Sequence, residues 1–261
     1  LAVCFGGKRP QLFLKKKLAK KLKTSFFPPT FFTIDEFIRY IYEKKCSSAF
    51  INDLNSYYFI YSLAQEVAPQ ILEKRAAFEQ FLPWAREIVK FIDNLDLENI
   101  QDERLLNIKA NAEIGYDVPK DVNGLLGHIL KLRHKYHKRL NEQNLISRGL
   151  QYLKASQHIN ETPLDEFDEI IFCNFFYFHQ TEEAIVKNLY HRGKATLIFQ
   201  GDQRKWPVLK RMAKNFECEL LEGDEPPKPT YDLKLYSGFD KHSQVGVVRE
   251  IVKDIKDLDK T

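Results

Sequence analysis

Two kinds of hydrophobic pattern divide this chain, and their order limits the possible folds more than any other feature. Short apolar runs, each followed by a helical pattern, occur near the start and again from residue 167 onward. Between residues 46 and 160, apolar residues recur only at helical spacing, and no convincing strand is predicted there. Alternating strand and helix units favour a parallel sheet. We therefore expect an α/β protein whose parallel core is interrupted by a large, all-helical block.

The apolar runs and turn signals place the individual elements. Strands are expected at residues 1–5, 170–172, 196–199, 218–221 and 233–237. Helices are expected at residues 11–23, 181–190, 208–215 and 243–255, the first with an apolar stripe of Leu12, Leu14, Leu18 and Leu22. Another helix should begin at Thr33, an N-cap residue with Glu36 three positions later. Its predicted buried face is Phe37, Ile38 and Ile41.

Composition narrows the class of protein. With 261 residues, 44% of them hydrophobic and 29% charged, the chain can bury one large core or two modest ones, which excludes a disordered protein. It begins at Leu1 rather than Met, so we expect it to be part of a longer protein. The four cysteines form no Cys-x-x-Cys pair, which indicates neither a zinc knuckle nor a disulfide framework and favours a cytoplasmic setting. A net charge of +4 is compatible with a polyanionic partner.

Ligands of parallel α/β sheets bind at the carboxyl ends of the strands, so the loops there carry the most information. The first strand is followed by Gly6, Gly7, Lys8 and Arg9, a combination that suits an anion at a helix start. The G-x-x-x-x-G-K-[ST] phosphate loop is absent, and no hydroxyl follows Lys8 to hold Mg²⁺. The loop therefore either contacts a phosphate backbone or is a tight turn with a solvated basic face.

The helix that follows favours the first alternative. Eight basic residues and no acidic residue lie between positions 8 and 23: Lys8, Arg9, Lys15, Lys16, Lys17, Lys20, Lys21 and Lys23. A cationic stripe of this kind is typical of nucleic-acid binding, although charged helix faces also occur on ordinary surfaces. We predict that Lys8, Arg9, Lys15 and Lys16 contact nucleic acid.

The loop after Phe172 decides whether nucleotide hydrolysis is possible. A hydrolase needs a carboxylate there to hold Mg²⁺, but the strand continues into Cys173 and Asn174. The acidic residues 165–169 precede the strand, so they lie at the amino end of the sheet, in a helix start or a solvated loop. The aromatic residues 175–178 are suited either to base stacking or to buried packing, which is the commoner use.

Two further sets of residues have the spacing of a possible site. Gly201, Asp202, Gln203 and Lys205 follow the strand at 196–199, an arrangement typical of a sensor loop. His134 and His137 are spaced for one helix face but lie among cations, so a solvated or DNA-facing surface is favoured over a zinc site. No metal ligand set or catalytic residue is predicted.

Taken in order, these loops resemble the first core domain of superfamily 1 helicases of the UvrD/Rep type. Residues 1–10 resemble the family's second conserved strand with its loop that contacts single-stranded DNA, and residues 33–37 resemble a conserved helix start. Residues 170–176 resemble the magnesium-binding strand, with Cys173 and Asn174 at the acidic positions.

The later motifs follow the same order. Residues 201–205 resemble the sensor loop, with Lys205 where the family has glutamine, and residues 236–239 resemble the entry into the second core domain. With the acidic residues replaced in this way, the chain resembles the inactivated helicase-like subunits of AddB/RexB-type helicase–nucleases. Members of that family carry a PD-(D/E)XK nuclease domain toward the carboxyl end.

The resemblance implies a P-loop NTPase-like (RecA-like) parallel core with a large helical insertion. The implied divisions are 1–45 and 161–224 for the core, 46–160 for the insertion, and 225–261 for the start of a second RecA-like domain. It also implies a non-catalytic DNA-binding scaffold in repair and recombination, without a cofactor in this part of the chain. Its partners would be single-stranded DNA or a duplex end, together with a second helicase–nuclease subunit.

Two alternatives stay open at this stage. The chain is also compatible with part of an active ATP-dependent DNA helicase whose phosphate loop precedes Leu1, although the missing carboxylates argue against it. The other alternative is a protein-interaction module in which the aromatic segment 57–61 of the helical block binds a partner.

Overall fold

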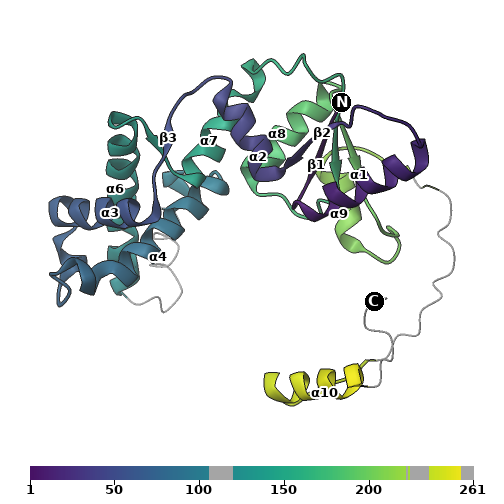
Figure 1. The fold of residues 1–261 in the computed structure, drawn as a ribbon. Helices are drawn as coiled ribbons and strands as arrows, with labels where there is room; N and C mark the ends of the chain where they lie inside the picture. Colours follow the sequence, from purple (N-terminus) through teal and green to yellow (C-terminus); the bar gives the residue numbers. More distant parts are fainter. Residues whose placement is uncertain (106–119, 222, 224–234, 254–261) are drawn as a thin grey trace. The chain divides into compact units, whose positions relative to one another are not determined.

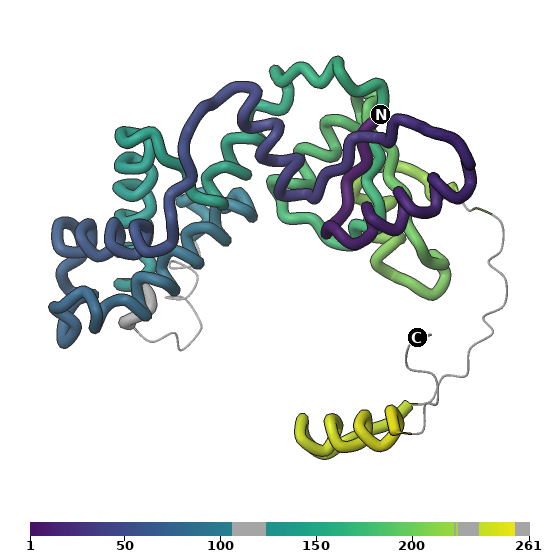
Figure 2. The backbone as a smooth tube through the Cα atoms, in the orientation of Figure 1, coloured from purple at the N-terminus to yellow at the C-terminus, as the bar shows by residue number. Residues whose placement is uncertain are grey.

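The computed structural model describes residues 1–105, 120–221, 223 and 235–253 (Figures 1 and 2). The chain divides into two compact units, Leu1–Cys218 and Glu219–Thr261. The first unit contains the sheets and most of the helices. In the second unit, the described element is the helix α10 (Lys241–Lys253), none of whose residues is buried.

A four-stranded parallel sheet forms the centre of the first unit. β1 (Ala2–Phe5) pairs with β2 (Thr30–Thr33) on one side and with β5 (Ile170–Cys173) on the other, and β5 pairs with β6 (Ala195–Ile198). The order is therefore β2-β1-β5-β6, with every pair parallel. This confirms the predicted α/β class and the parallel sheet. The edge strand β2 was not predicted, because only Thr33 in it is buried and two prolines precede it.

Helices flank this sheet, and their starts follow local sequence signals. They are α1 (Arg9–Leu22), α2 (Ile34–Glu43), α8 (Gln180–His191) and α9 (Pro207–Asn215). The predicted cap of α2 is confirmed, since the amide of Glu36 donates to the Thr33 hydroxyl (3.2 Å) and the amide of Thr33 donates to the Glu36 carboxylate (2.8 Å). The predicted buried face of α2 is also confirmed, and Phe37 packs edge-on against Phe172 of the sheet at 5.5 Å.

The chain between β2 and β5 is mainly helical. It comprises α3 (Asp53–Val67), η1 (Pro69–Leu72), α4 (Phe78–Leu97), α6 (Lys120–Glu142), α7 (Arg148–His158) and η2 (Ile159–Glu161). α3 packs against α4 and α6, whereas α7 packs against α4 and also against α2 and α8 beside the sheet (Figure 1). One hydrophobic core runs through both regions, so the helices and the sheet are parts of one folded unit.

Several predicted elements need correction. Two short strands, β3 (Ala49–Phe50) and β4 (Leu145–Ile146), pair in parallel within the region expected to be free of strands. With two residues each, they are too short to give an alternating pattern. Residues 218–221 and 235–237 form no strand; residues 233–234 lie outside the described residues. The leucine stripe of α1 is not a buried face, because no residue of α1 is buried and Leu12 is 67% exposed.

Among the described residues, no helix combines the length and apolar character needed to cross a membrane.

Candidate nucleic-acid interface

At the carboxyl edge of the sheet, Asn174 forms hydrogen bonds through both its backbone amide and its side chain. This residue follows β5 with φ of +60°, a left-handed conformation that asparagine tolerates better than most residues. Its amide donates to the carbonyl of Ile198 (2.8 Å), and its side-chain oxygen accepts from the amide of Gln200 (2.7 Å). Asn174 therefore links the loops after β5 and β6, and its only side-chain oxygen is already engaged.

The neighbouring Cys173 is equally unsuited to hold Mg²⁺. Burial raises the pKa of its thiol, so the side chain stays neutral and protonated at physiological pH. Mg²⁺ prefers carboxylates and other hard oxygen ligands. The end of β5 thus carries a neutral thiol and an amide at the two positions where the helicase resemblance implies acids.

The sensor-like loop is folded on itself. Asp202 forms an ion pair with Arg204 (3.1 Å), and its carboxylate also accepts from the amide of Arg204 (2.9 Å). These hydrogen bonds from Arg204 lower the pKa of Asp202. Gly201 lies close to the side chains of Leu209 and Trp206, where an added Cβ would meet atoms at 3.1 and 3.3 Å. Gln203 and Lys205 lie in the same turn, and Lys205 is exposed.

Aromatic side chains pack around the same edge. Phe175 and Phe178 are buried and stacked on each other at 5.1 Å, so packing, the commoner use of such a run, is confirmed for these two. Phe176 contacts Trp206 at 5.3 Å and thereby joins the loop after β5 to the start of α9. Tyr177 is exposed, and its hydroxyl donates to Glu98 (2.6 Å).

The cationic residues that follow β1 differ in whether they already have a partner within the protein. Lys8 pairs with Glu36 at 3.3 Å, and both side chains are substantially exposed. Because Glu36 also caps α2, Lys8 is held beside the sheet and its charge is partly neutralised. The Lys15 ammonium lies over the ring of Phe31 in β2, 5.1 Å from the ring centroid. Lys8 and Lys15 therefore have contacts within the fold, although both remain exposed.

The outer face of α1 combines charge with exposed apolar surface. Arg9, Leu12, Phe13 and Lys16 line a shallow hollow of about 350 Å³. Leu12 and Phe13 are 67% and 63% exposed, and α1 has no extensive packing against any other described element. Cations interleaved with an exposed aromatic ring are the features that bind a single strand, since the cations track phosphates and the ring stacks a base. Of the predicted residues, Arg9 and Lys16 thus lie on the face best suited to nucleic acid.

A buried charge cluster in the helical region was missed by sequence reasoning. Asp96 of α4 is fully buried, and it accepts from Arg133 (2.7 Å) and from His137 (2.8 Å) of α6. Arg133 also pairs with Asp102 at 3.1 Å, and His134 bonds to the same carboxylate. The predicted solvated or DNA-facing position holds for His134, which is 66% exposed, but not for His137, which is 19% exposed and bound to Asp96. A signal was present in the apolar spacing of α6, which places Arg133 beside Leu132 and Tyr136 on the buried face.

A second cluster also went unpredicted. His179 precedes α8, and its ring nitrogen Nδ1 lies 2.6 Å from the Glu98 carboxylate that also accepts from Tyr177. The hydrogen bond that the Tyr177 hydroxyl donates to Glu98 raises the pKa of Tyr177 to about 12. The cluster joins the end of α4 to the start of α8. It has no sequence signature, because Glu98 and His179 are far apart along the chain.

The aromatic segment 57–61 is largely engaged within the fold. Tyr61 contacts Phe78 at 5.4 Å and donates its hydroxyl to the carbonyl of Ala76 (2.6 Å). Ile60 is fully buried, while Tyr58 packs edge-on against Phe78 at 5.6 Å and keeps about half of its surface exposed. The segment therefore contributes mainly to the packing of α3 on α4.

Comparison with known proteins gives no relative from which a role can be transferred. No protein-family model matches the chain, and no curated protein matches it. Within residues 1–105, 120–221, 223 and 235–253, no three His, Cys, Asp or Glu side chains are grouped so that they would hold a metal ion. The candidate interface accordingly rests on its own chemistry, which is that of the α1 face.

Proposed function

We propose that this chain is a non-catalytic, degenerate helicase-like region that binds DNA as part of a repair and recombination helicase–nuclease. The observation that carries the proposal is the outer face of α1, where Arg9 and Lys16 flank the exposed ring of Phe13. The order of motifs described above supplies the helicase resemblance, and the four-stranded parallel sheet is compatible with a RecA-like core carrying a helical insertion at 46–160.

The carboxyl edge of the sheet supports the non-catalytic part of the proposal. Asn174 uses its side-chain oxygen to bind the amide of Gln200, and Cys173 is a protonated thiol. Phosphoryl transfer requires a carboxylate-held Mg²⁺ at such a position. We therefore expect no ATP turnover from this sheet edge, whatever precedes Leu1 in a longer chain. ATP hydrolysis that is lost on Asn174→Ala would instead support the alternative of an active helicase.

Binding of a labelled single-stranded oligonucleotide to the whole chain, followed by fluorescence anisotropy, tests the proposal. Arg9→Gln with Lys16→Gln should weaken binding about tenfold, because two phosphate contacts are lost. Lys8→Ala with Arg9→Ala should have a smaller effect, since Lys8 is already paired with Glu36. The matched control is Lys210→Gln with Lys214→Gln, which removes two exposed cations from α9. Equal affinities of the α1 variant, this control and the unmodified chain would refute the assignment to α1.

A further inference from the structure

The helix α6 carries a second cationic surface, and its charges fall into two groups. Arg133, His137 and Arg139 bind acidic side chains of α3 and α4, at distances of 2.7 Å to Asp96, 2.8 Å to Asp96 and 2.9 Å to Glu66 respectively. Lys131, Lys135 and Lys138 are exposed, and their spacing places them together on one face of the helix. The first group already binds acidic side chains within the protein, so the second group is the one available to an external partner. We refer to Lys131, Lys135 and Lys138 as the lysine stripe.

The lysine stripe is almost unneutralised. Within the part of the chain that the structure describes, Lys131 and Lys135 have no ion-pair partner, and Lys138 has only Glu142 one turn away at 3.8 Å. Lys131 and Lys135 lie four residues apart on one helix face, so their ammonium groups repel each other unless an anion lies between them. The stripe covers eight residues, so its two ends are about 10 Å apart along the helix, less than a third of a duplex turn of about 34 Å. A single stretch of nucleic-acid backbone can thus contact all three.

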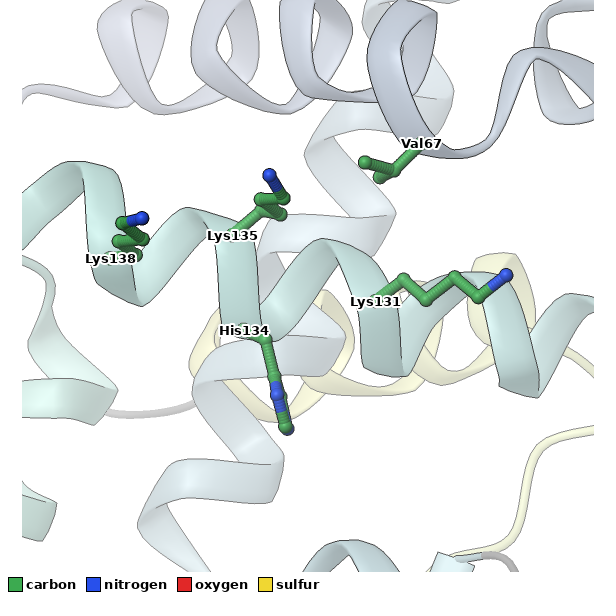
Figure 3. Close-up of a pocket in the computed structure, with 5 residues that line it drawn as sticks. All are labelled: Val67, Lys131, His134, Lys135 and Lys138. Carbon is green, nitrogen blue, oxygen red and sulfur yellow. The ribbon is translucent and has the colours of Figure 1, made fainter.

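The same surface is hollowed. Lys131, His134, Lys135 and Lys138 line an open depression of about 440 Å³ together with Val67, at the end of α3. Figure 3 shows Lys135 directed toward Val67, whereas His134 points to the other side of the helix. A rigid support lies underneath, because Leu132, Tyr136 and Leu140 of α6 are fully buried. The lysines are therefore presented by a helix that is fixed in the core.

The lack of large exposed apolar side chains on the described part of α6 helps to identify the polyanion. None of the described side chains of α6 is an exposed large hydrophobic residue, in contrast to Leu12 and Phe13 on α1. A membrane-binding helix would need an apolar face, and a single-strand site would need aromatic rings for the bases. Duplex nucleic acid presents only phosphates and sugars along its backbone and keeps its bases stacked inside.

We propose that the lysine stripe binds the phosphate backbone of duplex DNA, while α1 binds the single strand that extends from it. The identity of the ligand rests on the proposed function, but the stripe is a separate surface in the helical region and can be tested separately. The contacts are to backbone alone, so binding should be independent of sequence and strongly dependent on salt.

The test compares short blunt duplexes and single strands on the whole chain. Combined Lys131→Gln, Lys135→Gln and Lys138→Gln should weaken duplex binding at least about tenfold and reduce the salt slope by about 2 to 3, because each lost phosphate contact lowers it by about 0.9. Single-strand affinity should change less than about threefold. The matched control is Lys90→Gln, Lys210→Gln and Lys214→Gln, which removes three exposed cations elsewhere and should leave both affinities near those of the unmodified chain.

Several outcomes would overturn the inference. The duplex affinity of the triple variant could be unchanged, or it could fall no more than that of the control. The affinity for single strands could fall as much as the affinity for duplexes. In a parallel measurement with phosphatidylserine vesicles, the variant could lose affinity for vesicles alone. If the triple variant failed to fold, Lys135→Gln alone would show the same selectivity with a smaller loss. Failure of the Arg9→Gln, Lys16→Gln variant to affect single strands, together with a selective loss in the stripe variant, would refute the role of α1 and leave the stripe standing.

Discussion

α1 and α6 are both rich in cations, yet they relate to the fold in different ways. No residue of α1 is buried, and its cations lie on a helix that has little contact with the remaining structure. α6 buries one whole face, where Arg133 forms an ion pair with the buried Asp96 and His137 is hydrogen-bonded to the same carboxylate. The comparison teaches that the number of charges along a helix does not distinguish binding residues from structural ones. The two kinds are distinguished by whether each cation already has an acidic partner within the fold.

The largest effect on stability should come from breaking the internal charges of α6. Asp96→Ala removes the buried partner of Arg133 and leaves this residue paired only with the partly exposed Asp102. The cost should be about 3 kcal/mol, the lower end of the range for a broken buried ion pair. Urea denaturation monitored by circular dichroism measures this cost. Lys16→Gln on α1 is the matched surface variant and should change stability by less than about 0.5 kcal/mol. A cost below about 1 kcal/mol for Asp96→Ala would show that the cluster is not structurally required.

The next effect concerns the contact between α4 and α7. A Cβ on Gly149 would lie 2.6 Å from the backbone of Asp93, and no flexible side chain can move away to relieve it. Gly149→Ala should therefore destabilise the protein by about 1–3 kcal/mol or more, as overpacking does. Gly124→Ala in α6 is the control, because nothing lies within 4 Å of its added Cβ, and it should be neutral or slightly stabilising. Equal stability of the two variants would contradict the close approach.

A smaller effect is expected from pH. Burial raises the pKa of Glu166, but the hydrogen bonds with Lys44 and Tyr40 outweigh it and hold the pKa at about 2. A depressed carboxyl pKa contributes stability above the unfolded value of about 4.3, and this contribution is lost as pH falls toward 2. Asp93 acts in the opposite direction, because burial raises its pKa and favours the protonated form.

Denaturant titrations at several pH values isolate the contribution of Glu166. The stability difference between the unmodified chain and Glu166→Gln should be largest near neutrality and shrink as the solution is acidified below about pH 4. Glu169→Gln, next to β5, is the matched control at a neighbouring carboxylate. A difference that stays constant on acidification would mean that Glu166 does not have a depressed pKa.

The smallest change in stability should come from the outer face of α1. Phe13→Ser removes a ring that is 63% exposed, so the free energy of unfolding should change by less than about 0.5 kcal/mol. Single-strand binding should nevertheless weaken by about 1–3 kcal/mol, the contribution of one stacked base. Leu18→Ser is a useful contrast, because Leu18 is half-buried on the other side of α1. A large loss of stability in Phe13→Ser would show that the ring is part of the core.

The sequence predicted the parts of the fold that are encoded locally. β1, β5 and β6 are short apolar runs, and the Thr33–Glu36 cap of α2 is a four-residue signal. β2 could not be predicted in the same way, because its side chains are mostly half-exposed and its pairing with β1 depends on tertiary structure. The leucines of α1 illustrate the opposite error, since their helical spacing is correct but nothing in the described structure covers Leu12 or Leu22.

For the candidate site, the sequence predicted where the residues lie better than it predicted which contacts they make. Asn174 was expected to mark a missing acid, and the structure adds that its oxygen binds the amide of Gln200. Lys8 was expected to face nucleic acid, but its pairing with Glu36 depends on how β1 and β2 align. The buried Asp96 and its partners on α6 could not be foreseen, because Asp96 and Arg133 lie 37 residues apart.

The central claim is that the outer face of α1 contacts a single strand of DNA, and photo-crosslinking tests it most directly. A single-stranded oligonucleotide carrying a halogenated base is irradiated with the whole chain, and the adducts are mapped by mass spectrometry after digestion with trypsin. Phe13 lies in the tryptic peptide that spans residues 9–15, because Pro10 protects the bond after Arg9. The account predicts that this peptide carries the main adduct and that Phe13→Ser removes it. Adducts confined to other peptides, with residues 9–15 unmodified, would contradict it.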